Sequence, residues 1–171
     1  MGTLNYDTFP RSGTHTLGLI LDLAFPNYKK FWGQHNPKTL NNDNAITVVR
    51  HYKDAISSLC CLDTKLNIQK TIDTYCYFYE TISQFNVYYC SLVDLSAEPN
   101  KVMFNYAQKY NLDKPSFVNV QEYQDQMLHK FPDCYPRQIS NTKATILGCI
   151  ENADLSKIEL LWQGLNKKCA I

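Results

Sequence analysis

Residues 9–17 read Phe9-Pro10-Arg11-Ser12-Gly13-Thr14-His15-Thr16-Leu17. They join a short apolar run to a long apolar segment with helical spacing, which predicts a turn that opens a helix. Gly13 lets a ligand come close to the backbone, and the N–H groups and dipole of a first helical turn favour an anion. Arg11 adds a fixed charge whose five donors suit phosphate or sulfate oxygens. An ordinary capped helix start after a proline turn is the alternative that this stretch leaves open.

Strands and helices are predicted to alternate around this turn. Short β-branched or apolar runs predict strands, and apolar residues at helical spacing predict helices. The predicted strands are 4–9, 45–49 and 87–93, and the predicted helices are 14–25, 54–60, 68–82, 99–110 and 155–165, with a loop over 27–44. Asp54 is the expected cap of the helix that starts there. This order predicts an α/β fold with a helical C-terminal part, in which helices flank a parallel sheet that binds ligands at the carboxyl ends of its strands.

The composition of the chain limits its number of domains, its partners and its location. With 171 residues, 44% of them hydrophobic and 13% aromatic, the chain is expected to form one domain over residues 1–171 with a substantial core. A net charge of +1 gives no general attraction to nucleic acid or to anionic membranes, so neither is an expected partner. No apolar run approaches a membrane span, and the polar first residues do not read as a signal peptide, so a soluble cytoplasmic protein is expected.

The cysteines favour a reducing compartment. There are seven, an odd number without a Cys-x-x-Cys pair, and several lie in apolar segments, so they are interpreted as reduced core thiols. A secreted protein with a few disulfides is the alternative. No His, Cys and carboxylate residues are spaced as a metal site requires, so no metal is expected.

A second anion site is predicted at residues 50–58. Arg50 ends the strand 45–49, and the helix after it presents the Ser58 hydroxyl, which together suit a phosphate. The alternative is a solvated surface arginine. The chain has only three arginines, and two of them, Arg11 and Arg50, fall in the two predicted anion sites. The third, Arg137, is either one more anion contact or a plain surface residue.

Both motifs resemble those of the sulfotransferases that use 3′-phosphoadenosine-5′-phosphosulfate (PAPS). Residues 9–16 resemble the family's phosphosulfate loop, in which Pro, Lys or Arg, Ser-Gly-Thr and a further Thr open the first helix; His15 stands in place of that Thr. Residues 50–58 resemble its Arg-Asn-Pro-Lys-Asp motif with a later Ser, although Tyr52 stands where Pro or Ala is usual. Residues 87–112 match the family's next strand and helix more weakly, and the whole resemblance covers about residues 4–112.

The resemblance implies a role for each matched residue. The 5′-phosphosulfate would be held by the loop residues Arg11, Ser12, Gly13, Thr14, His15 and Thr16. The 3′-phosphate would be held by Arg50 and Ser58, and Arg11 would also offset charge on the bridging oxygen. His35, within Gly33-Gln34-His35-Asn36-Pro37, corresponds to the catalytic base, because a neutral imidazole can take the proton of an acceptor hydroxyl. Asp43 is the reserve candidate for the base.

The implied reaction transfers a sulfuryl group from PAPS to a hydroxyl or amine and leaves the product 3′-phosphoadenosine-5′-phosphate (PAP). The resemblance also implies the three-layer fold of P-loop proteins. The acceptor is expected to be a small molecule, a glycan or a peptide. A non-catalytic protein that binds PAP or another nucleotide, or serves a structural role, is one alternative. A small kinase that uses ATP and magnesium is another, which the missing Gly-Lys-Ser/Thr ending of the loop disfavours.

Overall fold

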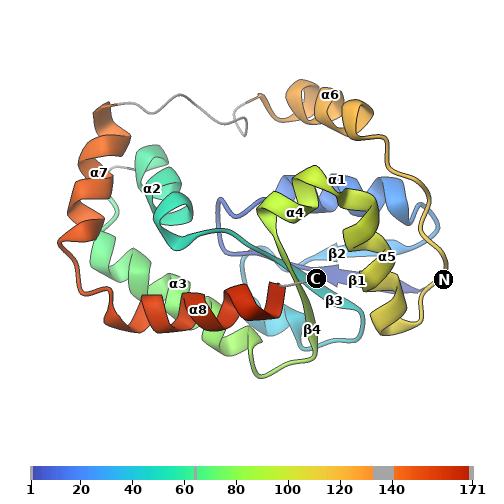
Figure 1. Ribbon diagram of the computed structural model, residues 1–171, viewed down its shortest axis with the longest axis horizontal. Helices are drawn as coiled ribbons and strands as arrows, with labels where there is room; N and C mark the ends of the chain where they lie inside the picture. The colour runs from blue at the N-terminus through green and yellow to red at the C-terminus, as the bar shows by residue number, and fades with distance from the viewer. Residues whose placement is uncertain (1, 64, 133–140, 170–171) are drawn as a thin grey trace.

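The computed structural model describes residues 2–63, 65–132 and 141–169. Within these residues the chain forms an α/β fold with a four-stranded, all-parallel sheet flanked by helices, which confirms the predicted fold class (Figure 1). The strands are β1 (Thr3–Tyr6), β2 (Lys29–Trp32), β3 (Ala45–Val49) and β4 (Val87–Ser91). The helices are α1 (Thr14–Ala24), the 3-10 helix η1 (Pro37–Leu40), α2 (Tyr52–Leu62), α3 (Ile68–Ile82), α4 (Leu92–Ala97), α5 (Pro99–Tyr110), α6 (Val120–Lys130), α7 (Asn141–Glu151) and α8 (Ser156–Cys169).

The order of the strands reverses at β1. The sheet runs β2-β1-β3-β4, so the chain steps from β1 to one side and then returns to pair β3 on the other side. Tyr6 pairs with both Trp32 and Ile46, and all of the pairings are parallel, so the carboxyl ends of the strands lie at one edge. Such a reversal between neighbouring parallel strands is where ligands bind in open α/β sheets.

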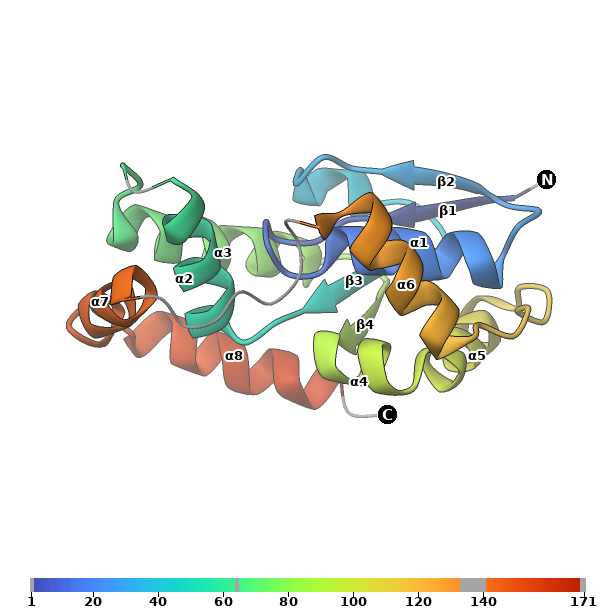
Figure 2. The same cartoon turned by 90° about the horizontal axis from the view of Figure 1, so that it is seen from above.

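The sheet separates two hydrophobic cores, which gives the fold three layers (Figures 1 and 2). Side chains of β3 alternate between the two: Ile46 and Val48 pack with α1, α5 and α6, whereas Ala45 and Val49 pack with α2, α3 and α8. Every residue of β3 is buried, as expected for a strand covered on both faces.

Two phenols of α3 hold the end of β3. Tyr75 donates a hydrogen bond of 2.8 Å to the carbonyl of Arg50, and Tyr79 donates one of 2.9 Å to the carbonyl of Val48. The two tyrosines are four residues apart, so they lie on one face of the helix. The tyrosines of α3 therefore fix the main chain at the end of β3, just before α2 begins.

The segment between α1 and β3 differs from the prediction. The loop predicted over 27–44 is wrong in part, because it contains β2 and η1. β2 is an edge strand with mostly exposed residues, so neither an apolar run nor a clean alternation marks it in the sequence. The strand predicted over 4–9 ends at Tyr6, because the chain turns after Thr8 and the Ser12 N–H donates to the Phe9 carbonyl at 3.0 Å.

The ends of three other elements are also corrected. The cap of α2 is His51, which accepts from the Lys53 N–H at 3.3 Å, and not Asp54; burial of Tyr52 brings the helix start forward. β4 stops at Ser91, short of residue 93, because the Ser91 hydroxyl accepts from the Asp94 N–H at 3.0 Å and so starts α4. The last helix continues past 165 to Cys169.

Candidate functional site

The turn between β1 and α1 has the geometry of a loop built around Gly13. Gly13 caps α1 with a φ of 99°, and it has no side chain that could accept from the first N–H groups of the helix. A Cβ atom at this position would lie 2.6 Å from Cδ1 of Leu92, so both the backbone conformation and the close side chain favour glycine here. Arg11 also has a positive φ, 64°. The start of α1 thus presents backbone donors without a competing side-chain cap.

The hydroxyls of this loop lie mostly inside the protein. Ser12 is fully buried, and the Thr14 hydroxyl forms a hydrogen bond with the hydroxyl of Thr8. Thr16 is half-buried at the first turn of α1. In this structure an anion at the loop would therefore meet backbone N–H groups and Arg11 rather than the hydroxyls of Ser12 and Thr14.

His15 lies on the outer side of the loop. Its ring stacks on Phe131 with a centroid distance of 4.2 Å and an interplanar angle of 20°. Partial burial lowers the pKa of His15, and the charges of Arg11 and His35 lower it further. This lowered pKa favours a neutral His15 ring.

The two predicted anion motifs meet directly. Arg50 follows β3 and donates from Nη1 to the carbonyl of Arg11 at 2.8 Å. Arg11 in turn donates from Nε to the hydroxyl of Ser58, on α2, at 3.2 Å. These two bonds span 39 and 47 positions of the sequence, and they join Arg11, Arg50 and Ser58 in one cluster. Burial lowers the pKa of Arg50 from its ordinary value, and the Arg11 charge adds to that effect against an opposing contribution from Asp54.

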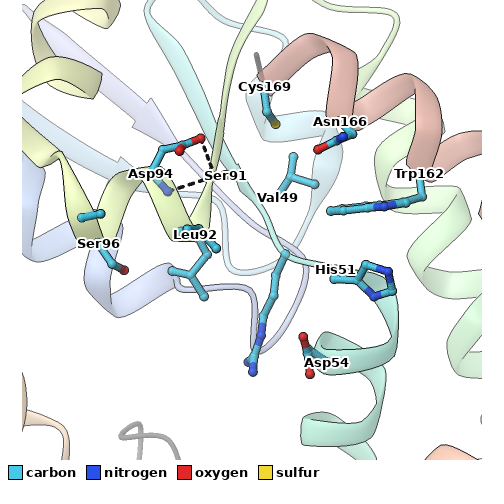
Figure 3. A pocket seen from close by; sticks show the side chains of 13 residues that line it. Val49, His51, Asp54, Ser91, Leu92, Asp94, Ser96, Trp162, Asn166 and Cys169 are labelled. Atoms are coloured by element: carbon cyan, nitrogen blue, oxygen red, sulfur yellow. Dashed lines mark hydrogen bonds between the residues drawn. The ribbon is translucent and has the colours of Figure 1, made fainter. Parts of the chain in front are cut away.

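A cavity of about 790 Å³ opens beside Arg50 at the carboxyl ends of β3 and β4. Figure 3 shows the rings of Trp162 and His51 on one side of it and Ser91, Leu92 and Asp94 on the other. Its wall is completed by side chains from α2, α4 and α8, among them Asp54, Ser96, Asn166 and Cys169. The volume is in the range of small-molecule sites, roughly 300–1,000 Å³.

The aromatic wall of the cavity is ordered by ring contacts. The His51 ring stacks on Tyr52 at 4.7 Å and meets the edge of Trp162 at 4.8 Å. Burial lowers the pKa of His51, with Asp54 acting in the opposite direction and Lys53 in the same one. Trp162 was not expected at the site, since α8 lies more than one hundred residues after Arg50 in the sequence. His51 directly follows Arg50 within the predicted motif, but the sequence assigned it no role.

His35 is held against the residues that follow β1. Its Nδ1 atom lies 2.7 Å from the carbonyl oxygen of Thr8, and its backbone N–H donates to Oδ1 of Asp7 at 3.0 Å. A carbonyl can only accept, so Nδ1 carries the proton and Nε2 has the lone pair in the neutral ring. The edge of the ring contacts Trp32 with a centroid distance of 5.5 Å, and a third of the side chain is exposed.

The other sequence-predicted residues lie away from this cluster or outside the described residues. Asp43 is exposed just before β3, at the amino end of the strands, so the fold separates it from Arg11 and Arg50. Arg137 lies outside the described residues. Six described cysteines are free, and of these Cys149 is exposed, so the interpretation as core thiols does not extend to it. In the part of the chain that is described, no three metal-ligating side chains cluster.

Among residues 2–63, 65–132 and 141–169, no helix has both the length and the apolar character needed to cross a bilayer. Comparison with known proteins adds no assignment: no protein-family model matches this chain, and no curated protein matches it. The candidate site therefore stands on the residues of the two arginine motifs, on His35 and on the cavity that Arg50 lines.

Proposed function

We propose that this chain is a sulfotransferase that transfers a sulfuryl group from PAPS to the hydroxyl or amine of an acceptor and releases PAP. The observation that carries the proposal is the direct contact between the two arginine motifs, in which Arg50 bonds the backbone of Arg11 and Arg11 bonds Ser58. PAPS carries a phosphate at each end of its ribose, and two linked arginine sites suit a ligand with two neighbouring anionic groups.

The cavity beside Arg50 is where we propose that the nucleoside binds. Arg50 belongs both to the arginine cluster and to the cavity wall. Trp162 offers a flat apolar face for a base, and the side chains of Ser91 and Asn166 offer polar groups to its edge. A mononucleotide without a 3′-phosphate would leave one arginine motif without its anion, which favours PAPS over ATP.

His35 has the protonation pattern that a general base requires. Its Nδ1 proton is held by the Thr8 carbonyl, so the lone pair at Nε2 is available to an acceptor hydroxyl. As the acceptor oxygen attacks sulfur, the proton moves to Nε2, the bond from sulfur to the bridging oxygen breaks, and the electron pair leaves with PAP. Arg11 and the backbone N–H groups of α1 would offset charge on that leaving oxygen.

Calorimetric titration with PAP, and separately with ATP plus magnesium, tests the cofactor class. We expect tight binding of PAP and weak binding of ATP. Incubation with sulfur-labelled PAPS and a panel of alcohols, glycans and peptides then tests turnover. Binding of ATP with magnesium but not of PAP would favour the kinase alternative. Binding of PAP without transfer to any acceptor would identify a non-catalytic nucleotide-binding protein.

A further inference from the structure

A buried carboxylate lies behind His35 and has no role in the transfer described so far. Asp7 directly follows β1 and is fully buried. Its Oδ1 atom accepts from the N–H of Thr8 at 2.9 Å and from the N–H of His35 at 3.0 Å. The same oxygen lies 3.8 Å from Nδ1 of the His35 ring. Oδ1 of Asp7 thus accepts a hydrogen bond from the backbone of the proposed base and also lies near its ring nitrogen.

The backbone at His35 needs such a support. Gln34 and His35 have φ angles of 55° and 64°, and two consecutive non-glycine residues in the left-handed region are held there only by surrounding contacts. The hydrogen bond from the His35 N–H to Asp7 supplies one contact, and the ring bond to the Thr8 carbonyl supplies another. Gly33 allows this approach, since a Cβ atom there would lie 2.6 Å from Oδ2 of Asp7.

The charge at position 7 is costly to the fold. Burial raises the pKa of Asp7, while the N–H donors of Thr8 and His35 and the His35 ring oppose that effect. An uncharged amide of the same shape would keep an acceptor for both N–H groups without the desolvation of a carboxylate. Burial of this acid is unfavourable, and the acid lies beside the one ring that is proposed to gain a proton during transfer. Together these two facts point to a role for its charge.

We propose that Asp7 is the positioning residue of the base: it fixes the left-handed backbone of His35 and stabilises the imidazolium that forms when Nε2 takes the acceptor proton. Asp7 itself remains a carboxylate throughout. The inference rests on the proposed function for its catalytic part. The other titratable groups linked to this corner include Tyr6, whose pKa is raised by burial and by the charges of Asp22 and Asp7, and His15, whose pKa is lowered by burial and by the charges of Arg11 and His35. Among these groups, Asp7 is the carboxylate that lies 3.8 Å from the His35 ring nitrogen.

The test is Asp7→Asn, with Asp22→Asn as the matched control. Asp22 is an exposed carboxylate of α1 that pairs with Lys30 at 3.4 Å, so the control removes the same charge without touching His35. For Asp7→Asn we expect kcat to fall roughly 10-fold or more, with the KM for PAPS little changed and the protein no less stable to heat. In the same variant, the nuclear magnetic resonance signals of the His35 ring should titrate at lower pH than in the wild type.

A reciprocal measurement covers the case in which Asp7→Asn does not fold. In the wild-type protein the carboxyl carbon of Asp7 should respond to the titration of His35, and in His35→Gln its own titration should move to higher pH. Absence of both responses would overturn the inference. If the wild type transfers no sulfate at all, the proposed function fails, whereas the ring titration still decides whether Asp7 and His35 are coupled. A folded Asp7→Asn variant with an unchanged kcat and an unchanged titration of the His35 ring would also overturn the inference about Asp7.

Discussion

Replacement of Arg50 by alanine is the most direct perturbation of the proposed nucleotide site. The guanidinium lines the cavity and holds the Arg11 carbonyl at 2.8 Å, so the variant loses a phosphate contact and loosens the neighbouring loop. A hydrogen bond to a charged group contributes about 1.5–3 kcal/mol, and the bond to the loop carbonyl adds about 1 kcal/mol. Together they predict that PAP binds more weakly by about 2.5–4 kcal/mol, or roughly 70- to 900-fold.

The assay is calorimetric titration with PAP at one fixed ionic strength, with Lys53→Ala as the matched control. Lys53 lies three residues further on and pairs with Glu151 on the surface at 3.3 Å, outside the cavity wall. Loss of the Lys53 charge changes only the long-range electrostatic attraction of the protein, which salt screens. We therefore expect the affinity of Lys53→Ala for PAP to stay within about twofold of the wild type. Thermal melting of both variants shows whether the fold is intact; loss of one half-buried bond should lower the Tm of Arg50→Ala by only about 2–4 °C.

Two results would refute this reasoning. Equal weakening in Arg50→Ala and Lys53→Ala would mean that the protein attracts PAP by its overall field and not by a site at the end of β3. Wild-type affinity in a folded Arg50→Ala would place the phosphates elsewhere.

Four further outcomes are expected. His35→Ala should lower sulfate transfer by roughly 10²- to 10⁴-fold while PAP affinity is retained, which a transfer assay beside calorimetry checks; full activity would remove His35 as the base. Trp162→Ala should weaken PAP by about 1–3 kcal/mol but leave binding of inorganic phosphate unchanged, and equal losses for both ligands would contradict a base-stacking role. Gly33→Ala should destabilise the fold by about 1–3 kcal/mol in chemical denaturation, since the added methyl would overlap the Thr39 hydroxyl, and Thr39→Ala in the same chain should restore part of that loss. His15→Thr should keep or improve PAPS affinity, and a large loss would reveal a specific contact of the imidazole.

The parts of the fold that the sequence predicts are those with a strong local pattern. β3 is a run of apolar and β-branched residues buried on both faces, and α3 has a continuous apolar stripe, so both are recognised without tertiary information. β2 is missed because an edge strand with exposed side chains has no such pattern. The start of α2 is misplaced because burial of Tyr52, a tertiary contact, outweighs the capping preference of Asp54.

The residues of the candidate site also differ in whether the sequence alone reveals them. Arg11 and Arg50 are found from sequence because each follows a strand and precedes a helix. Asp7 is missed because its importance comes from a bond to a residue 28 positions away, and a single aspartate after a strand signals nothing by itself. Trp162 is missed for the same reason, since only the packing of α8 against β3 and β4 brings it to the cavity.

The paired phenols of α3 have a consequence for the thermodynamics of binding. Tyr75 and Tyr79 fix the carbonyls of Arg50 and Val48, so the main chain that carries the guanidinium is ordered before any ligand arrives. Ordering one residue costs about 1–2 kcal/mol of conformational entropy, and here that loss occurs during folding rather than during binding. A chain without these hydroxyls would keep every group that faces the ligand, yet its affinity would fall through a more unfavourable entropy of binding at nearly constant enthalpy.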